Sequence, residues 1–239
     1  HRYSVDDLLT AREAMRALEG QPPPDAYIDL GCGIGSVLLM VAHHLNEARI
    51  VGVEAQALSF GLAERNVERN GLGEQVRLLH GDLRDPAVHA DALSDGRFDL
   101  VTGTPPYAPP GTSVPSPDSQ RCFARVEMRG GIEDYLAAAA KLVKPTGRVV
   151  VCGVANAPER ARTGAAAASL RMLCRVDAIP RAGREALFSV WTFAPEGHAP
   201  DQPFAERAYV ARDADGQRTD ASFRIRTFFG FDPPTEQDS

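Results

Sequence analysis

The chain has 239 residues, of which 44% are hydrophobic and 24% are charged, and its formal net charge is −6. This composition is typical of a globular protein with a substantial core. The acidic balance disfavours strong non-specific binding to nucleic acid. No apolar run approaches the roughly 20 residues that span a bilayer, and the first residues lack a signal-peptide pattern, so we expect no membrane partner. The four cysteines form no CxxC pair, which favours free thiols in the cytoplasm and no metal site.

The first half of the chain alternates expected helices and strands. A helix at 5–19 has apolar residues on one face. The Gly- and Pro-rich stretch 20–25 ends that helix and connects it to the next element. A strand, a helix, a strand, a helix and a strand then follow in turn, at 26–30, 35–47, 48–54, 56–70 and 76–80. A turn-rich segment at 84–96 leads to a further strand at 97–102.

The second half continues the alternation after a loop rich in Pro, Ser and Gly at 108–120, which we expect to be mobile. A helix, a strand and a helix are expected in turn, at 131–143, 148–154 and 158–171. Two extended stretches at 173–179 and 186–194 are typical of a hairpin. The tail from residue 195 onward is polar, has a weak strand signal at 207–212, and contains aromatic residues at 228–231 that we expect to hold it against the body.

The pattern of buried strands and intervening helices predicts an α/β protein with a Rossmann-like fold. Its sheet is expected to have seven strands, mainly parallel, with a terminal antiparallel hairpin and helices on both faces. We expect a single domain over 1–239, made of an N-terminal helix and linker (1–25), a core (26–194) and a C-terminal extension (195–239). In such a sheet, ligands bind at the carboxyl ends of the strands.

The first strand runs into three glycines at alternate positions, Gly31, Gly33 and Gly35. Glycine accepts backbone dihedrals that a Cβ forbids, so this turn lets a ligand approach the backbone closely. A dinucleotide fingerprint has the spacing GxGxxG, but here Ser36 stands where the last glycine would be. The turn therefore fits a nucleoside without a pyrophosphate better than NAD.

Three further strand ends carry polar or turn-forming residues. Glu54 ends the second strand and suits two ribose hydroxyls, and Asp82 follows the third strand and suits an adenine amino group. The segment 104–107 follows the fourth strand. Either acid alone is explained equally well as a helix cap, but their joint order and spacing favour one nucleoside pocket.

These residues resemble the motifs of the class I methyltransferases that use S-adenosylmethionine. Residues 29–35 (DLGCGIG), Glu54, Asp82 and 104–107 (TPPY) are similar to their first four motifs. Within that class, the chain most resembles the small-methyltransferase group and its bacterial tRNA(Val) adenine-N6 methyltransferases. The resemblance implies that S-adenosylmethionine is bound and S-adenosylhomocysteine released. The cofactor-binding residues that it implies are Asp29, Gly31, Cys32, Gly33, Gly35, Glu54, Ala55, Asp82 and Leu83.

The resemblance also implies that Thr104, Pro105, Pro106 and Tyr107 hold the target amine. A Pro-Pro turn fixes two φ angles and directs backbone carbonyls into the site, and a tyrosine face stacks a flat substrate. The sulfonium is already activated, so catalysis would be mostly positioning and requires no general base. The histidines are therefore expected to be structural. Substrate-binding roles are expected for Tyr107, Arg121 and Arg125, although the two arginines fit a solvated helix face equally well.

Thr104 departs from the family pattern, in which asparagine is usual. A threonine offers one hydroxyl, whereas an amide offers an acceptor and two donors. Methylation of a nitrogen, with adenine in tRNA or other RNA as the leading substrate, is the expected activity. The alternatives are a protein glutamine, a small-molecule amine, or a catalytically silent cofactor-binding module. The segment before the first strand is short for the helical recruiting domain expected of protein-modifying relatives.

Overall fold

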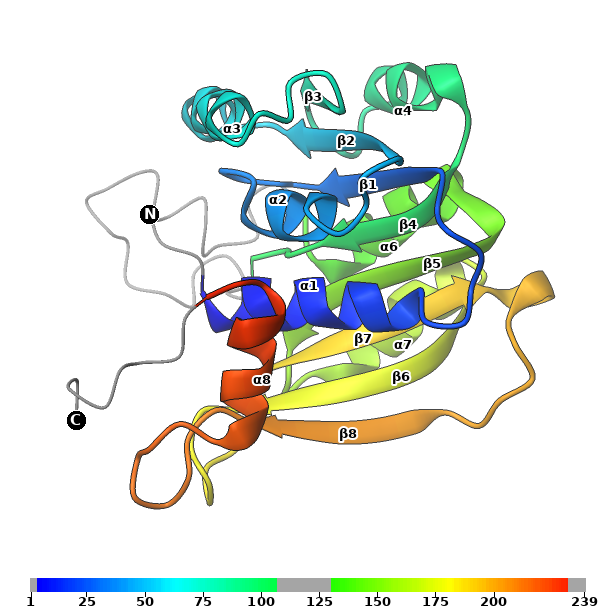
Figure 1. Ribbon diagram of the computed structural model, residues 1–239. Coiled ribbons are helices and arrows are strands. Elements are labelled where there is room, and N and C mark those ends of the chain that lie inside the picture. Colours follow the sequence, from blue (N-terminus) through cyan, green and yellow to red (C-terminus); the bar gives the residue numbers. More distant parts are fainter. Residues whose placement is uncertain (1–3, 107–129, 232–239) are drawn as a thin grey trace.

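A mixed β-sheet forms the centre of the protein, and helices cover both of its faces (Figure 1). The computed structural model describes residues 4–106 and 130–231. Within them, the sheet has eight strands in the order β3-β2-β1-β4-β5-β7-β6-β8. The strands are β1 (Ala26–Leu30), β2 (Arg49–Glu54), β3 (Val76–His80), β4 (Phe98–Gly103), β5 (Val143–Val154), β6 (Leu170–Ile179), β7 (Phe188–Pro195) and β8 (Ala205–Val210).

The strands from β3 to β5 are parallel, β7 runs antiparallel to β5 and β6, and β8 is parallel to β6. Seven α-helices belong to the described residues: α1 (Val5–Ala17), α2 (Ser36–Ala42), α3 (Ala57–Arg69), α4 (Pro86–Ala92), α6 (Ile132–Leu142), α7 (Pro158–Ala167) and α8 (Asp220–Phe228). In these parts of the chain, no helix combines the length and the apolar character that crossing a membrane requires.

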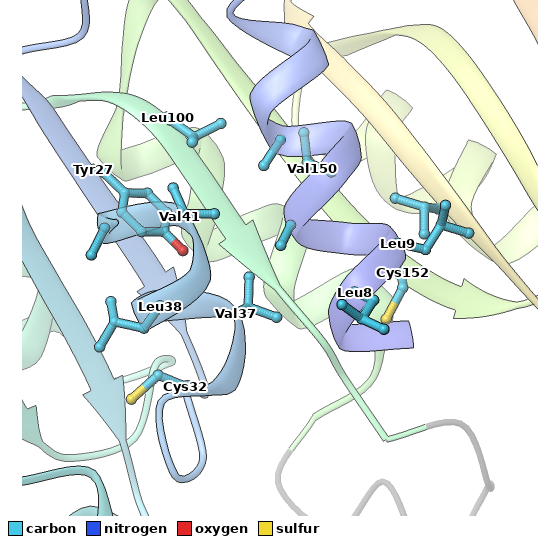
Figure 2. Packing of buried hydrophobic residues seen from close by; sticks show 14 of the residues in the cluster. Leu8, Leu9, Tyr27, Cys32, Val37, Leu38, Val41, Leu100, Val150 and Cys152 are labelled. Carbon is cyan, nitrogen blue, oxygen red and sulfur yellow. The ribbon is translucent and has the colours of Figure 1, made fainter. Parts of the chain in front are cut away.

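Two hydrophobic clusters pack the helices onto the sheet. On one face, Leu9 of α1 and Val41 of α2 belong to the same cluster as Tyr27 of β1 and Val150 of β5 (Figure 2). On the other face, α4, α6 and α7 contribute to a second cluster that includes Trp191 of β7. All five residues of β1 are buried, because a parallel strand at the centre of the sheet is covered on both sides. This explains why four of its five residues are apolar rather than every second one, with Asp29 as the exception.

The α/β Rossmann-like fold with its antiparallel hairpin is confirmed, but the sheet has eight strands instead of seven. The additional strand, β8, lies within the expected C-terminal extension and pairs with β6. The hairpin of β6 and β7 is therefore not at the edge of the sheet. Four of the six residues of β8 are exposed, so its sequence has only a weak strand signal. Helix α8 packs nearby against α1, and His44 stacks on Phe228 with ring centroids 4.5 Å apart.

Two other expectations were wrong. The segment 84–96 was expected to be turns, but it contains α4, whose N-cap Asp85 accepts a hydrogen bond from the Ala87 amide at 2.8 Å. Asp followed by Pro is a turn signal, but it is also an N-cap followed by a first-turn proline. The residues 143–147 were expected to end a helix, but they begin β5, where a Cβ on Gly147 would lie 2.9 Å from the carbonyl oxygen of Phe98.

Candidate active site

The polar strand ends meet at one edge of the sheet. Leu30 at the end of β1 is paired with Val53 of β2 on one side and with Gly103 of β4 on the other. Glu54, the last residue of β2, is paired with His80, the last residue of β3. The arrowheads of β1 and β2 in Figure 1 point to this edge. The glycine turn, Glu54, Asp82 and the Pro-Pro turn therefore lie along one line of strand ends.

The glycine turn has the left-handed backbone that its sequence predicts. Gly31, Gly33 and Gly35 have φ angles of +61°, +58° and +88°. The amide of Cys32 donates to the carbonyl of Val53 at 2.9 Å, which ties the turn to β2. The side chain of Cys32 is buried, so this residue presents mainly its backbone to the edge of the sheet.

Both carboxylate oxygens of Glu54 accept hydrogen bonds from backbone amides. Its Oε2 accepts from the amide of Gly33 at 2.8 Å, and its Oε1 accepts from the amide of Gln56 at 2.7 Å. The residue is 6% exposed. Each carboxylate oxygen has a further lone pair, so Glu54 can fix the turn and still accept hydrogen bonds from a ligand. Ala55, which follows it, is half-buried.

Asp29 lies beneath the turn instead of facing solvent. The hydroxyl of Thr102 donates to its Oδ1 at 2.6 Å, and Thr102 is also hydrogen-bonded to the hydroxyl of Tyr27 at 2.8 Å. Burial raises the pKa of Asp29 to about 7, opposed by hydrogen bonds from Thr102 and the Leu38 amide. The negative charges of Asp7 and Glu54 raise it further. This buried carboxyl therefore links β1, β4 and α2.

Asp82 already has a partner at the end of β3. Its carboxylate accepts from the Arg84 guanidinium through Nε at 2.9 Å and Nη2 at 2.7 Å. The carbonyl of Leu83 is hydrogen-bonded to the ring of His89 at 2.6 Å. His89 is buried. A ligand amine at Asp82 would have to share the carboxylate with Arg84 or displace it.

The Pro-Pro turn follows β4 and borders a small hollow. Thr104 and Pro106 are half-buried and Pro105 is buried. Ile132, Val154 and Trp191 line this hollow together with the two prolines and Arg160. The other expected substrate residues, Tyr107, Arg121 and Arg125, lie outside the described residues. Among the described ones, no cluster of His, Cys, Asp and Glu side chains has a metal-binding arrangement.

Tyr135 of α6 also reaches the site, and the sequence analysis did not single it out. A Cβ on Gly103 would lie 2.5 Å from Cδ1 of its ring, and a Cβ on Gly31 would overlap its hydroxyl oxygen. The sequence placed Tyr135 on the apolar face of a helix, where it is indistinguishable from a core residue. The available signal was a hydroxyl on an otherwise aliphatic face, with a small residue at the end of each of two neighbouring strands.

Comparison with known proteins supports a methyltransferase. Residues 28–127 match the family model described as "Methyltransferase domain". A tRNA1(Val) (adenine(37)-N6)-methyltransferase of Porphyromonas gingivalis is 28% identical over 192 residues, which cover 80% of this chain and 74% of that protein. A release factor glutamine methyltransferase of Geobacter sulfurreducens is 40% identical over 93 residues, 39% of this chain and 30% of that protein. A solved structure, a predicted O-methyltransferase (Atu636) of Agrobacterium tumefaciens, superposes with a TM-score of 0.68 at 15% identity and covers 96% of this chain and 99% of its own.

The chain is thus an S-adenosylmethionine-dependent methyltransferase with the class I, Rossmann-like fold. The resemblance to the small-methyltransferase group, and in it to the bacterial tRNA1(Val) adenine-N6 methyltransferases, is confirmed by the P. gingivalis relative. Membership of this family also confirms the prediction that S-adenosylmethionine is the cofactor.

Proposed function

We propose that the protein transfers a methyl group to the exocyclic amine of adenine in tRNA or other RNA, in the cytoplasm. The observation that carries this proposal is the pairing of Leu30 with Gly103. Because the residues after Leu30 and after Gly103 then lie side by side, the pairing supports a site in which the Pro-Pro turn would hold the amine next to a methyl donor at the glycine turn. The choice of adenine is supported by the name of the P. gingivalis relative, which covers most of this chain.

The cofactor-binding residues divide by strand. In this proposal, the backbone at Gly31, Cys32, Gly33 and Gly35 contacts the cofactor at the end of β1. Glu54 accepts from the ribose hydroxyls with its remaining lone pairs, beside Ala55. Asp82 and Leu83 form the adenine end. Asp29 acts through the turn, because its buried carboxyl holds β1 against β4.

The substrate side follows from the turn after β4. When bound, the cofactor supplies an activated methyl on a sulfonium, so the protein's task is to position the amine in line with it. The hydroxyl of Thr104 and the carbonyl of Pro105 accept hydrogen bonds from the N–H groups of the amine. The hollow beside the prolines, lined by Ile132 and Trp191, suits one edge of a flat ring. Tyr107, Arg121 and Arg125 remain proposed contacts for the base and for phosphates.

A protein glutamine is the second candidate substrate. The observation that favours it is the 40% identity to the G. sulfurreducens glutamine methyltransferase over 93 residues. A glutamine amide and an adenine amine both present an –NH2 group on a planar system, so the Pro-Pro turn serves either. A small-molecule amine is a third candidate substrate, and its methylation would follow the same chemistry.

The test is transfer of a labelled methyl group from S-adenosylmethionine into an extract of a strain that lacks the protein, after which RNA and protein are separated. We expect label in tRNA as N6-methyladenosine. Glu54→Ala should abolish the label, and Glu206→Ala, on the exposed edge strand β8, should not change it. Label in protein or in small molecules would reject RNA but keep the cofactor site. Cofactor binding without any label would identify a silent binding module.

A further inference from the structure

The side chain of Tyr135 lies across the carboxyl ends of the paired strands β1 and β4. Its ring lies against Gly103, where a Cβ would be 2.5 Å from Cδ1. Its hydroxyl lies against Gly31, the first residue of the glycine turn. Because Gly31 directly follows Leu30, the partner of Gly103, the hydroxyl ends at the junction of the two turns that define the site.

No hydrogen bond to the Tyr135 hydroxyl occurs among the described residues, although the residue is only 6% exposed. Its oxygen is not one of their fully buried unpaired atoms, so it is open to a ligand. The hydroxyl of a largely buried tyrosine usually has a hydrogen-bond partner. An accessible hydroxyl without a protein partner, at the junction of the two turns, therefore favours a polar ligand atom at this position.

The surroundings of this hydroxyl are negatively charged. Burial raises the pKa of the Tyr135 hydroxyl most, and the negative charges of Glu54 and then of Asp29 raise it further. Within the described chain, hydrogen bonds hold both groups, but neither forms an ion pair with a lysine or arginine. A ligand group with a positive charge and N–H donors complements such an environment.

The strand order shows which part of the cofactor lies here. Along β3-β2-β1-β4, the proposed adenine end is at Asp82 after β3 and the ribose is at Glu54 after β2. The next position along this edge is the end of β1, where the hydroxyl of Tyr135 lies against Gly31. The remaining part of the cofactor is its amino-acid end, which carries an ammonium group.

We propose that the hydroxyl of Tyr135 accepts a hydrogen bond from the ammonium group at the amino-acid end of the cofactor and positions that end against the glycine turn. Tyr135 is thereby a cofactor-binding residue on α6, outside the four motifs. This inference rests on the proposed function for the location of adenine and ribose. It requires no covalent step.

The test compares two ligands that differ in the amino-acid end. S-adenosylhomocysteine has it, and 5′-methylthioadenosine lacks it. Calorimetric dissociation constants are measured for the wild type, for Tyr135→Phe and for the control Tyr209→Phe, which removes a hydroxyl from β8. A hydrogen bond to a charged group corresponds to about 1.5–3 kcal/mol, so we expect Y135F to weaken S-adenosylhomocysteine about 10- to 100-fold. The affinity for 5′-methylthioadenosine should not change, and Y209F should change neither.

Equal weakening of both ligands by Y135F, or no weakening of either, would overturn the proposal, because each result fits a purely structural tyrosine. If Y135F does not fold, tyrosine labelled with 13C at Cζ provides a second measurement on the wild type. The Tyr135 resonance should shift with S-adenosylhomocysteine and not with 5′-methylthioadenosine, and the absence of this difference would refute the contact. If the wild type binds neither ligand, the proposed function itself fails. If Y135F binds both normally while the wild type methylates RNA, only the role of Tyr135 fails.

Discussion

Replacement of Gly31 by alanine tests the close contact between the glycine turn and α6. The new Cβ would lie less than 3.0 Å from the hydroxyl oxygen of Tyr135 and 3.1 Å from Cζ of its ring. The backbone at Gly31 also has φ +61°, a conformation that alanine adopts with strain. The substitution therefore has two separable costs, and only the steric one depends on Tyr135.

The magnitudes differ enough to be distinguished. The left-handed backbone costs about 1–2 kcal/mol for a residue with a Cβ. Forcing a methyl group into a packed site adds about 1–3 kcal/mol, so G31A should lower the free energy of unfolding by about 2–5 kcal/mol in total. Tyr135→Phe alone should change it by less than about 1 kcal/mol, because its hydroxyl has no hydrogen bond to lose among the residues that the structure describes. In the double variant the nearest ring atom is at 3.1 Å, so most of the steric cost disappears.

The assay is urea denaturation of the wild type, the two single variants and the double variant. We expect a favourable coupling of about 1–3 kcal/mol between the two substitutions, which leaves mainly the backbone cost in the double variant. Gly20→Ala is a matched control. It has φ +75°, but no atom of the described residues would lie within 4 Å of an added Cβ, so it should show no coupling with Y135F. If the effects of G31A and Y135F add within about 0.5 kcal/mol, the contact is absent and the reasoning is wrong.

Three further predictions concern the buried polar groups and the Pro-Pro turn. The pKa of Asp29 is raised from 3.8 to about 7, so the folded state binds its proton more tightly. Stability should therefore fall as pH rises from about 4 to 7, by up to about 4 kcal/mol relative to Asp29→Asn in parallel urea titrations; identical pH profiles would contradict the shift. Thr102→Val should cost about 2–4 kcal/mol in urea denaturation, because it removes a hydrogen bond to Asp29 and leaves Tyr27 with an unpaired hydroxyl. Thr10→Val is its control: the Thr10 hydroxyl is buried without a hydrogen-bond partner in the described part of the chain, so this change should be neutral or stabilising, and equal losses would mean that burial alone matters. Thr104→Asn should raise kcat on RNA about tenfold, since an amide adds donors and an acceptor at the target amine; a fall in the methyl-transfer assay would indicate that threonine suits a different substrate.

Much of the site could be predicted because it consists of local patterns at strand ends. A strand followed by Gly31, Gly33 and Gly35 specifies a left-handed turn by sterics alone, and the structure has that turn. The position of Glu54 beside it follows from the rule that parallel strands present their carboxyl ends at one edge. The hydrogen bond from the amide of Gly33 to Glu54 shows that the two strand ends are in direct contact, as this rule predicts. No tertiary information was needed to expect these groups to converge.

Other features could not be predicted because they depend on what packs against a segment. Asp82 was predicted to be available to a ligand, but its carboxylate is paired with Arg84 two residues away. The sequence 85–86 fits both a turn and a helix start, and only the packing of α4 selects the helix. Strand β8 has little hydrophobic pattern of its own and exists because the edge of β6 supplies its hydrogen-bond partners.

The sequence by itself determined the class of fold, the glycine turn, the order of the strand-end residues and, through its motifs, the methyltransferase class. Only the tertiary structure decided that Asp29 is buried and that Tyr135, more than a hundred residues from the turn, places its hydroxyl against Gly31. The reason is physical. Backbone sterics and hydrophobic periodicity act over a few residues and are visible in a linear pattern. The partner of a buried hydroxyl or carboxyl depends on which segments the sheet brings together, and no local pattern records that.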